Sequence, residues 1–317
     1  MPPILVVGSV AYDTVKTPFG EASEALGGSA TYFSVSAGFF AHVSLVAAVG
    51  QDFKEEDWRF LESRNIDLQG LKRVDGKTFR WVGEYGYDLN DARTLDTQLN
   101  VLAEFQPNLS DAHRDIKHVF LGNLDPKIQR DVLAQVTKPQ LVACDTMNYW
   151  INGHFNSLLE TLRRVDILII NDAEARQLTR ESNLIRAARK IHGWGPGTVV
   201  VKRGEYGALM FQRDVQGRIS VFGTPAYPLE DIFDPTGAGD TFAGGFMGYL
   251  AGVGRSDWAS LRQAVVFGSV MASFNVEKFS LDRLRNLTFT EIELRYKEFK
   301  EMTRIDDVVE WQPDSRV

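Results

Sequence analysis

A glycine-rich stretch from Asp234 to Leu250 constrains the fold of this chain more than any other feature. Gly237 and Gly239 permit a tight turn and the close approach of a ligand to the backbone. A glycine-rich turn that opens a helix presents free N–H groups and the positive end of the helix dipole, which together bind an anion. Apolar residues then recur at helical spacing, at Phe242, Phe246, Tyr249, Leu250 and Val253. The stretch therefore predicts an anion-binding turn at the start of a helix.

The helix expected after this turn is rich in glycine, at Gly244, Gly245 and Gly248. Because glycine is a weak helix former, we expect another element to pack very close to this helix. Asp240 lies in its first turn, beside the proposed anion site. The Asp240 carboxylate either only caps the helix or acts as a general base on a hydroxyl that attacks a phosphoryl group.

The full run Asp-Pro-Thr-Gly-Ala-Gly-Asp-Thr-Phe-Ala-Gly-Gly at 234–245 resembles the C-terminal signature of the ribokinase/PfkB family of carbohydrate kinases almost residue for residue. The resemblance implies ATP-dependent phosphorylation of a hydroxyl on a sugar or related polyol. Asp240 would be the general base. The developing negative charge would be held by the N–H groups of Gly237, Ala238 and Gly239.

Composition excludes several other classes of function. The formal net charge of −7 argues against a broad nucleic-acid surface. We find no apolar run of the about 18–20 residues that span a bilayer. The chain starts with Met-Pro-Pro and a strand rather than a signal peptide, and its one cysteine, Cys144, fits a reducing compartment. We therefore expect a cytoplasmic protein that binds neither membranes nor nucleic acid.

Short, continuously apolar runs alternate with helical patterns along most of the chain. Such runs are typical of parallel strands covered on both faces, and their alternation with helices predicts a doubly wound sheet. The expected strands are 3–10, 43–49, 118–121, 141–145, 167–170 and 198–202, followed by a hairpin at 208–212 and 218–222. We predict an α/β fold with a ribokinase-like, doubly wound, mostly parallel sheet flanked by helices, in a single domain over residues 1–317.

The stretch 72–101 has a different pattern, in which aromatic residues occupy alternate positions: Phe79, Trp81, Tyr85 and Tyr87. A period of two residues predicts a strand whose two faces have unlike surroundings. We expect a small β-sheet lid, formed by parts of about 14–25 and 72–101. Its aromatic side chains either pack within the lid or a dimer contact, or stack on the substrate.

Three segments near the N-terminus indicate an acceptor site. Asp13 follows the first strand, at the sheet edge where open α/β sheets bind ligands, so it is either a turn residue or a carboxylate that binds substrate hydroxyls. Gly27, Gly28 and Ser29 resemble the family's N-terminal Gly-Gly signature, which lines the substrate pocket. Many sugar kinases carry asparagine at the position of Tyr32. Tyrosine offers a π-face and one hydroxyl in place of amide groups, which argues against ribose-type recognition.

Two further motifs would hold metal ions. Asn171 and Glu174 begin a predicted helix, where they would cap it. The same Asn-x-x-Glu spacing resembles the family's magnesium-associated motif, and Mg²⁺ prefers oxygen ligands. The resemblance also implies K⁺ near the glycine-rich loop, where Asp234 and Thr236 are placed to offer oxygens.

The expected nucleotide site follows the strand at 198–202. The turn after it resembles the family's nucleotide-contacting turn, in which glycines let the backbone approach ATP. Lys202 would meet phosphate or remain a solvated charge. The nucleotide-binding residues implied are Asn171, Lys202, Gly204, Gly207, Gly237, Gly239 and, where the adenine pocket closes, Asn275.

Three alternatives to a sugar kinase remain open. A nucleoside kinase of the adenosine type shares the fold, and Tyr32 with the aromatic lid suits stacking on a base. A ligand-binding regulator that has lost catalysis is disfavoured by the presence of Asp240, Gly237 and Glu174. An interaction role through the lid is the third, since lid-to-lid homodimers occur in the family. In the first two cases the partner is a small-molecule sugar, polyol or nucleoside.

Overall fold

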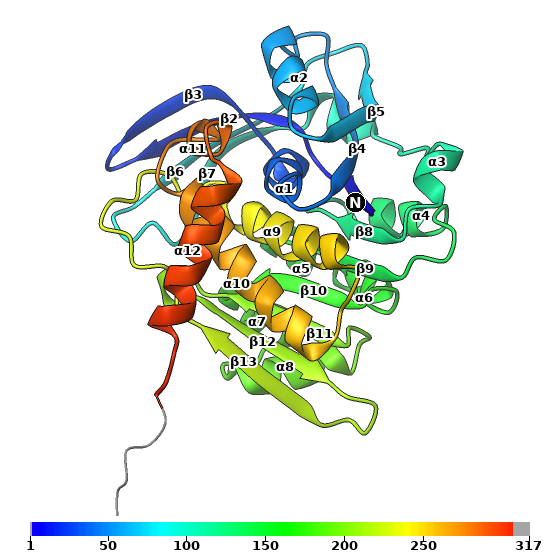
Figure 1. Cartoon of the computed structure of the whole chain (residues 1–317). Coiled ribbons are helices and arrows are strands. Elements are labelled where there is room, and N and C mark those ends of the chain that lie inside the picture. The colour runs from blue at the N-terminus through cyan, green and yellow to red at the C-terminus, as the bar shows by residue number, and fades with distance from the viewer. Residues whose placement is uncertain (1, 307–317) are drawn as a thin grey trace, which may run out of the picture.

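A nine-stranded sheet forms the centre of the molecule, and helices cover both of its faces (Figure 1). This computed structural model describes residues 2–306. The strand order is β13-β12-β11-β10-β9-β8-β1-β4-β5; neighbours from β11 to β5 run parallel, whereas β12 and β13 are antiparallel. The strands are β1 Pro3–Val7, β4 His42–Val49, β5 Ile66–Arg73, β8 His118–Leu121, β9 Leu141–Cys144, β10 Ile167–Asn171, β11 Thr198–Lys202, β12 Ala208–Arg213 and β13 Ile219–Thr224.

Each face of this sheet has its own hydrophobic core. Along β1, Ile4 and Val6 face one core while Leu5 and Val7 face the other. Over the first core lie α1 Ser29–Ala37, α2 Glu55–Glu62, α9 Ala238–Val253, α10 Trp258–Asn275, α11 Asp282–Arg285 and α12 Phe289–Met302. On the second side are α3 Asp111–Arg114, α4 Pro126–Leu133, α5 Asn148–Gly153, α6 Phe155–Leu162, α7 Asp172–Thr179 and α8 Leu184–His192. The predicted α/β architecture is confirmed.

Helix α9 is clamped between α1 and α10, as its glycines predict. A Cβ atom on Gly244 would lie 2.4 Å from the Phe33 carbonyl oxygen of α1. A Cβ atom on Gly245, on the side of α10, would lie 2.8 Å from Met271 Cγ. Larger side chains would push the three helices apart, so the glycines set how closely the helix beginning at the anion-binding turn packs.

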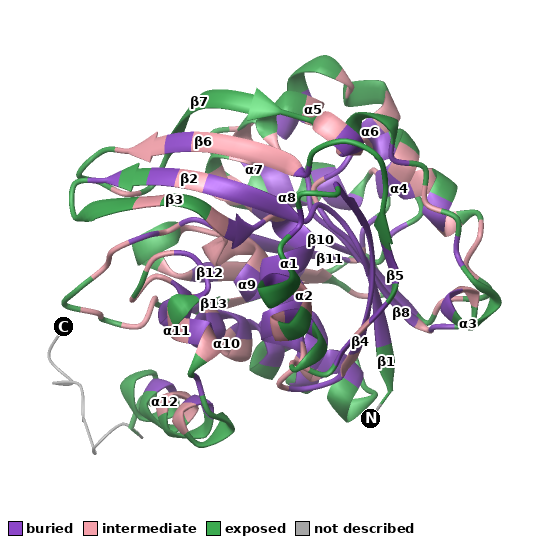
Figure 2. Ribbon diagram, turned by 90° about the horizontal axis from the view of Figure 1, so that it is seen from above, coloured by how far each residue is buried: buried purple, intermediate pink, exposed green. Residues whose placement is uncertain are grey.

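A second, four-stranded sheet stands beside the main one (Figure 2). Its order is β3-β2-β6-β7, with β2 and β6 parallel and the outer pairs antiparallel. Its strands are β2 Ala11–Thr17, β3 Gly20–Gly27, β6 Phe79–Tyr85 and β7 Ala92–Gln98. Because β2 begins shortly after β1 ends, this small sheet adjoins the carboxyl edge of the main sheet, where ligands bind in open α/β folds. Strand β7 is exposed along its whole length.

Two elements differ from the sequence-based expectation. The first strand ends at Val7 instead of residue 10. Strand β5 was not predicted: it is an edge strand, and its exposed Gln69, Lys72 and Arg73 interrupt the apolar run that marks a buried strand. The sequence at about 280–317 predicts a mostly charged helical tail with an irregular end; its helices are α11 and α12, and residues 307–317 lie outside the described residues.

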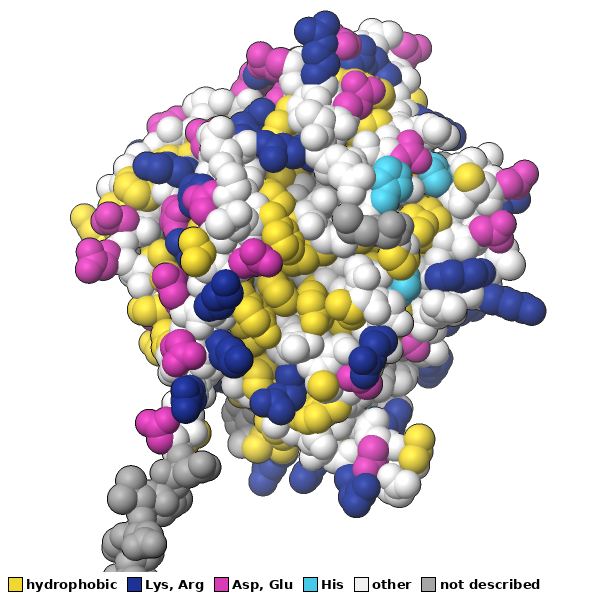
Figure 3. Space-filling view, in the orientation of Figure 1, with side chains coloured by type: hydrophobic (Ala, Val, Ile, Leu, Met, Phe, Trp, Pro, Cys, Tyr) yellow, Lys and Arg dark blue, Asp and Glu magenta, His cyan; other side chains and the backbone are white. Residues whose placement is uncertain are grey.

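The surface is mixed in character. On the face drawn in Figure 3, Lys and Arg side chains are interspersed with Asp and Glu around a central apolar area over α1, α9 and α10. Within residues 2–306, no helix is both long and apolar enough to cross a membrane.

Candidate active site

Polar side chains gather where three neighbouring parallel strands end. Asp145 follows β9, and Asn171 and Lys202 are register partners at the ends of β10 and β11. The carboxyl ends of parallel strands meet at one edge of the sheet, so these residues lie side by side. The start of α9 meets the same place, because a Cβ atom on Gly239 would lie 2.7 Å from the Lys202 ammonium nitrogen. The structure thus brings the predicted phosphate loop and Lys202 together.

Lys202 is the centre of a largely buried charge cluster. Its Nζ atom lies 3.4 Å from Asp145 Oδ2, and the two side chains are 16% and 8% exposed. Burial lowers the pKa of Lys202, but the carboxylates of Asp145, Glu174 and Asp240 outweigh it and raise that pKa overall. The ammonium therefore stays charged beside the positive end of α9, an arrangement suited to a phosphate group.

The carboxyl groups around Lys202 are hard to ionise together. Burial raises the pKa of Asp240 to about 7; Asp145 adds to the rise and Lys202 opposes it. Burial also raises the pKa of Glu174 to about 7, again with a contribution from Asp145. A carboxyl group that titrates near neutrality is well matched to general base catalysis. A bound divalent cation would favour the ionised forms.

Asn171 and Glu174 form the capping box at the start of α7. The Glu174 N–H donates to Asn171 Oδ1 at 2.7 Å, and the Asn171 N–H donates to Glu174 Oε2 at 2.8 Å. The cap fixes Glu174 near Asp145 and Asp240, whose charges reach it. Oxygen donors of this kind fit Mg²⁺. In the described chain, no group of three or more His, Cys, Asp or Glu is placed to hold a metal ion.

The turn before α9 is held from several sides. Gly237 adopts φ 71°, a left-handed conformation that glycine permits. Asp234 Oδ1 accepts the N–H of Thr236 at 2.9 Å. Asn275, which is fully buried, donates to the Thr236 carbonyl at 2.8 Å and accepts from the Thr241 hydroxyl at 3.0 Å. Asn275 therefore braces the turn in this structure, and its predicted contact with adenine stays a prediction.

Asp13 faces this turn from the acceptor side. Its Oδ2 atom accepts the N–H of Gly28 at 3.3 Å, and a Cβ atom on Gly27 would lie only 1.9 Å from it. The Asp13 side chain therefore needs glycine at position 27. Burial raises the pKa of Asp13 to about 7, and the charges of Asp234 and Asp240 add to the rise. The charge of Asp240, the predicted base, thus reaches Asp13, the predicted acceptor-binding carboxylate.

Ser29 and Tyr32, which the sequence assigns to substrate binding, contact the protein interior. Ser29 Oγ accepts the N–H of Ser9 at 3.2 Å and lies 3.1 Å from the Ser9 hydroxyl. Tyr32 is 1% exposed, and its ring packs under Gly237, where a Cβ atom would lie 2.3 Å from it. Both residues support the walls of the site here, and their contact with a substrate stays a prediction.

The small sheet carries an aromatic side chain next to Asp13. Asp13 on β2 and Trp81 on β6 are register partners, so their side chains project from the same face. The Trp81 Nε1 atom donates to Thr94 Oγ1 at 3.2 Å, and the indole lies where a Cβ atom on Gly83 would be 2.2 Å away. The indole therefore lies along the sheet toward β7, on the same face as the predicted acceptor carboxylate.

The predicted nucleotide turn follows β11. Gly204 and Gly207 have φ of 54° and 80°. A Cβ atom on Gly207 would lie 2.0 Å from the Thr224 carbonyl oxygen, so packing requires glycine there. A Cβ atom on Gly204 would lie 2.5 Å from Asn90 Oδ1, at the tip of the β6–β7 hairpin. The hairpin thus extends from the acceptor side to the predicted nucleotide turn.

Sequence analysis missed three residues of this arrangement: Asp145, Tyr85 as a neighbour of the turn, and Asn90. Asp145 could have been found, since it is a carboxylate directly after a buried strand. Tyr85 and Asn90 reach the site only through the pairing of β6 with β2, which no local pattern encodes.

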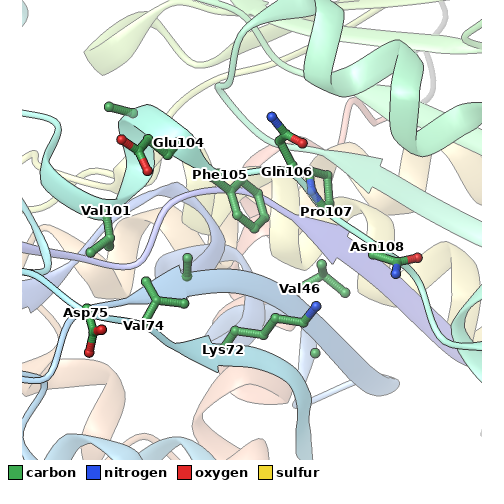
Figure 4. Close-up of a pocket in the computed structure, with 13 residues that line it drawn as sticks. Val46, Lys72, Val74, Asp75, Val101, Glu104, Phe105, Gln106, Pro107 and Asn108 are labelled. Carbon is green, nitrogen blue, oxygen red and sulfur yellow. The ribbon is translucent and has the colours of Figure 1, made fainter.

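A separate hollow of about 750 Å³ lies between β4, β5 and the segment after β7 (Figure 4). Val46, Lys72, Val101 and Phe105 are among its lining residues. None of the predicted site residues lines it. We therefore place the candidate active site at the carboxyl edge of the main sheet.

Comparison with known proteins identifies the family of this chain. Residues 2–285 match the pfkB family carbohydrate kinases. The chain is 33% identical over 257 residues to a cytidine kinase from Thermococcus kodakarensis, covering 78% of this chain and 89% of that protein. It is 29% identical over 294 residues to a nucleoside kinase from Methanothermobacter thermautotrophicus, covering 86% and 89%.

Solved structures show the same fold. The nucleoside kinase of Methanocaldococcus jannaschii superimposes with a TM-score of 0.74 at 20% identity, covering 94% of this chain and 99% of that one. A ribokinase from Thermotoga maritima gives 0.73 at 21% identity, covering 94% and 100%. The fold and the family match thus define a kinase of the ribokinase type. The chain belongs to the pfkB family of carbohydrate kinases.

Proposed function

We propose that this protein is a nucleoside kinase that transfers the γ-phosphoryl group of ATP to a ribose hydroxyl. The observation that carries the proposal is Asp240 at the anion-binding turn, whose charge reaches Asp13, with the Trp81 indole on the same face of the small sheet as Asp13. A nucleobase has a flat π-system that can stack on an indole ring, and this suits a nucleoside acceptor. The cytidine and nucleoside kinases among the relatives support the same choice over the sugar kinase first expected.

In the proposed mechanism Asp240 takes the proton of the attacking hydroxyl as its oxygen bonds to the γ-phosphorus. The bond between that phosphorus and the bridging oxygen breaks, and ADP leaves. The N–H groups of Gly237, Ala238 and Gly239 and the Lys202 ammonium would stabilise the developing charge. In this structure the Ala238 N–H donates to the Pro235 carbonyl at 3.1 Å, so it would have to turn from that partner to the phosphate. Glu174 and Asn171 would hold Mg²⁺ through water, and Mg²⁺, when bound, neutralises phosphate charge. The hydroxyls of the acceptor would bind Asp13.

Activity should rise with pH through the neutral range, because Asp240 must be ionised to accept a proton. With its pKa raised to about 7 by burial, kcat/KM should fall about tenfold per pH unit below that value and level off above it. Glu174 and Asp13 titrate in the same range, so the acid limb belongs to the three carboxyl groups together, and it steepens where more than one of them must be ionised.

Asp145→Asn should move this limb to lower pH. The substitution removes a negative charge that raises the pKa of Asp240 and frees Lys202, which lowers it. The measurement is kcat/KM from pH 5 to 9 for both proteins. A limb that stays in place or moves to higher pH would contradict the assigned charge coupling.

ADP release across a panel of acceptors tests the proposed function. With Mg·ATP, we expect turnover with cytidine or another ribonucleoside and little with ribose, fructose or glycerol. Turnover with free sugars and with no nucleoside would contradict the proposed function and support a sugar kinase instead. ATP binding without turnover for any acceptor would instead favour the binding-protein alternative. Parallel assays with and without K⁺ test the predicted K⁺ requirement near Asp234, which already accepts N–H groups from Thr236 and Ser280.

The predicted homodimer would form through the small sheet. Its outer strand β7 is exposed along its length, and Leu95 on this strand is 48% exposed. An edge strand with unpaired backbone groups can add a strand from a second copy. The homodimer and the cytoplasmic location both stay predictions.

A further inference from the structure

The strand that carries Trp81 also sends a side chain to the phosphate side of the site. Tyr85 lies at the end of β6 with its hydroxyl oxygen 3.4 Å from the Thr236 hydroxyl oxygen. Burial raises the pKa of Tyr85, and the charges of Asp234, Asp13 and Asp240 raise it further. This hydroxyl therefore lies among the carboxylates of both halves of the site. Tyr85 is therefore a link from the small sheet to the anion-binding turn.

A contact with Thr236 can change the geometry of this turn. It directly precedes Gly237, whose left-handed conformation starts α9 and aims the N–H groups of the turn. The Thr236 N–H is held by Asp234 and its carbonyl by Asn275. Both of those partners belong to the main body of the protein. The Thr236 hydroxyl is the group that meets the small sheet.

The same hairpin also touches the nucleotide turn, where Asn90 lies against Gly204. Movement of the small sheet over an acceptor at Asp13 would thus shift its contacts with both the anion-binding turn and the predicted nucleotide turn. The 3.4 Å separation of the Tyr85 and Thr236 oxygens is long for a hydroxyl pair, and contacts of this kind tighten when the reacting complex forms.

We infer that Tyr85 is a positioning residue that couples closure of the small sheet over the acceptor to the geometry of the anion-binding turn. This inference rests on the proposed nucleoside kinase function. Tyr85 acts through Thr236, and the transferred phosphoryl group meets the turn and not the tyrosine. The contact already restrains the turn at 3.4 Å without an acceptor. It would tighten, align the turn for transfer and shut out water when an acceptor is enclosed.

The test uses the full chain with cytidine and Mg·ATP, and compares Tyr85→Phe with the matched control Tyr87→Phe on the same hairpin. Tyr87 is 86% exposed, so its hydroxyl can be removed without touching the turn. We expect Tyr85→Phe to lower kcat by about tenfold, the effect of one lost hydrogen bond, with both KM values within about twofold. ATP hydrolysis without acceptor should rise relative to transfer. Tyr87→Phe should match the wild type.

Variants of Thr236 distinguish positioning from simple packing. Thr236→Val should lower kcat as Tyr85→Phe does, and Thr236→Ser, which keeps the hydroxyl, should restore it. Combining Tyr85→Phe with Thr236→Val should cost no more than either change alone. Fully additive losses, an unchanged kcat in Tyr85→Phe, or a loss confined to the KM for cytidine would each overturn the inference.

A readout independent of turnover separates this inference from the proposed function. If wild-type protein phosphorylates no nucleoside, the proposed function fails. Amide hydrogen exchange at 234–241 with Mg·ATP bound still tests the link. Tyr85→Phe should exchange several-fold faster there than Tyr87→Phe, and equal exchange in the two variants would overturn the link.

Discussion

Asp240→Asn should lower kcat by about 10²–10⁴ while leaving ATP binding largely intact, because a positioned general base contributes that much to rate. Asparagine keeps the shape of the side chain but cannot accept the proton. The phosphate-binding groups, namely the N–H groups of the turn and Lys202, are unchanged. Steady-state ADP release and nucleotide titration measure the two quantities. Turnover within a few-fold of the wild type would remove Asp240 from the mechanism.

Stability supplies the control for this variant. Burial raises the pKa of Asp240 from 3.8 to about 7, so the folded protein favours the protonated carboxyl group. The contribution of this group to the free energy of unfolding is therefore fully present below pH 3.8 and is lost as the pH rises through 7. Asparagine carries no such charge. We therefore expect Asp240→Asn to melt at the same temperature as the wild type or higher at pH 8, with the difference vanishing near pH 4. A lower melting temperature at pH 8 would mean that misfolding explains the lost activity.

Features with a local cause could be predicted from the sequence. The strands that end at Asp145, Asn171 and Lys202 are continuous apolar runs, and the glycine turn before α9 is a short motif. The close packing of α9 also followed from local composition, because a helix with many glycines needs near neighbours. A parallel sheet then brings the strand ends together without further information.

Features that depend on tertiary pairing could not be predicted. Asp13 and Trp81 become neighbours through the register of β2 with β6, and a one-residue shift would turn Trp81 to the other face. Tyr32 also shows this limit. Its sequence context indicates a substrate pocket, whereas only the packing of α1 against the turn shows the ring under Gly237.

Asp13→Asn should lower kcat/KM for a ribonucleoside by about 10² or more and leave the KM for ATP nearly unchanged. A hydrogen bond from a hydroxyl to a charged carboxylate contributes about 1.5–3 kcal/mol, and a ribose offers more than one hydroxyl. Tyr12→Phe is the matched control. Tyr12 adjoins Asp13 on β2, but its hydroxyl faces the other way and donates to Asp57 at 3.0 Å. Its removal should affect stability and not the acceptor.

The acceptor itself completes this test. If Asp13 binds ribose hydroxyls, the wild type should phosphorylate 2′-deoxycytidine about 10–100-fold less efficiently than cytidine, because the missing hydroxyl leaves a buried carboxylate unpaired. Asp13→Asn should treat the two nucleosides nearly alike, since the group that distinguishes them is gone. If Asp13→Asn keeps the wild-type preference, another side chain reads the ribose. Asp13 would then hold the Gly27–Gly28 turn against β2 without binding the acceptor.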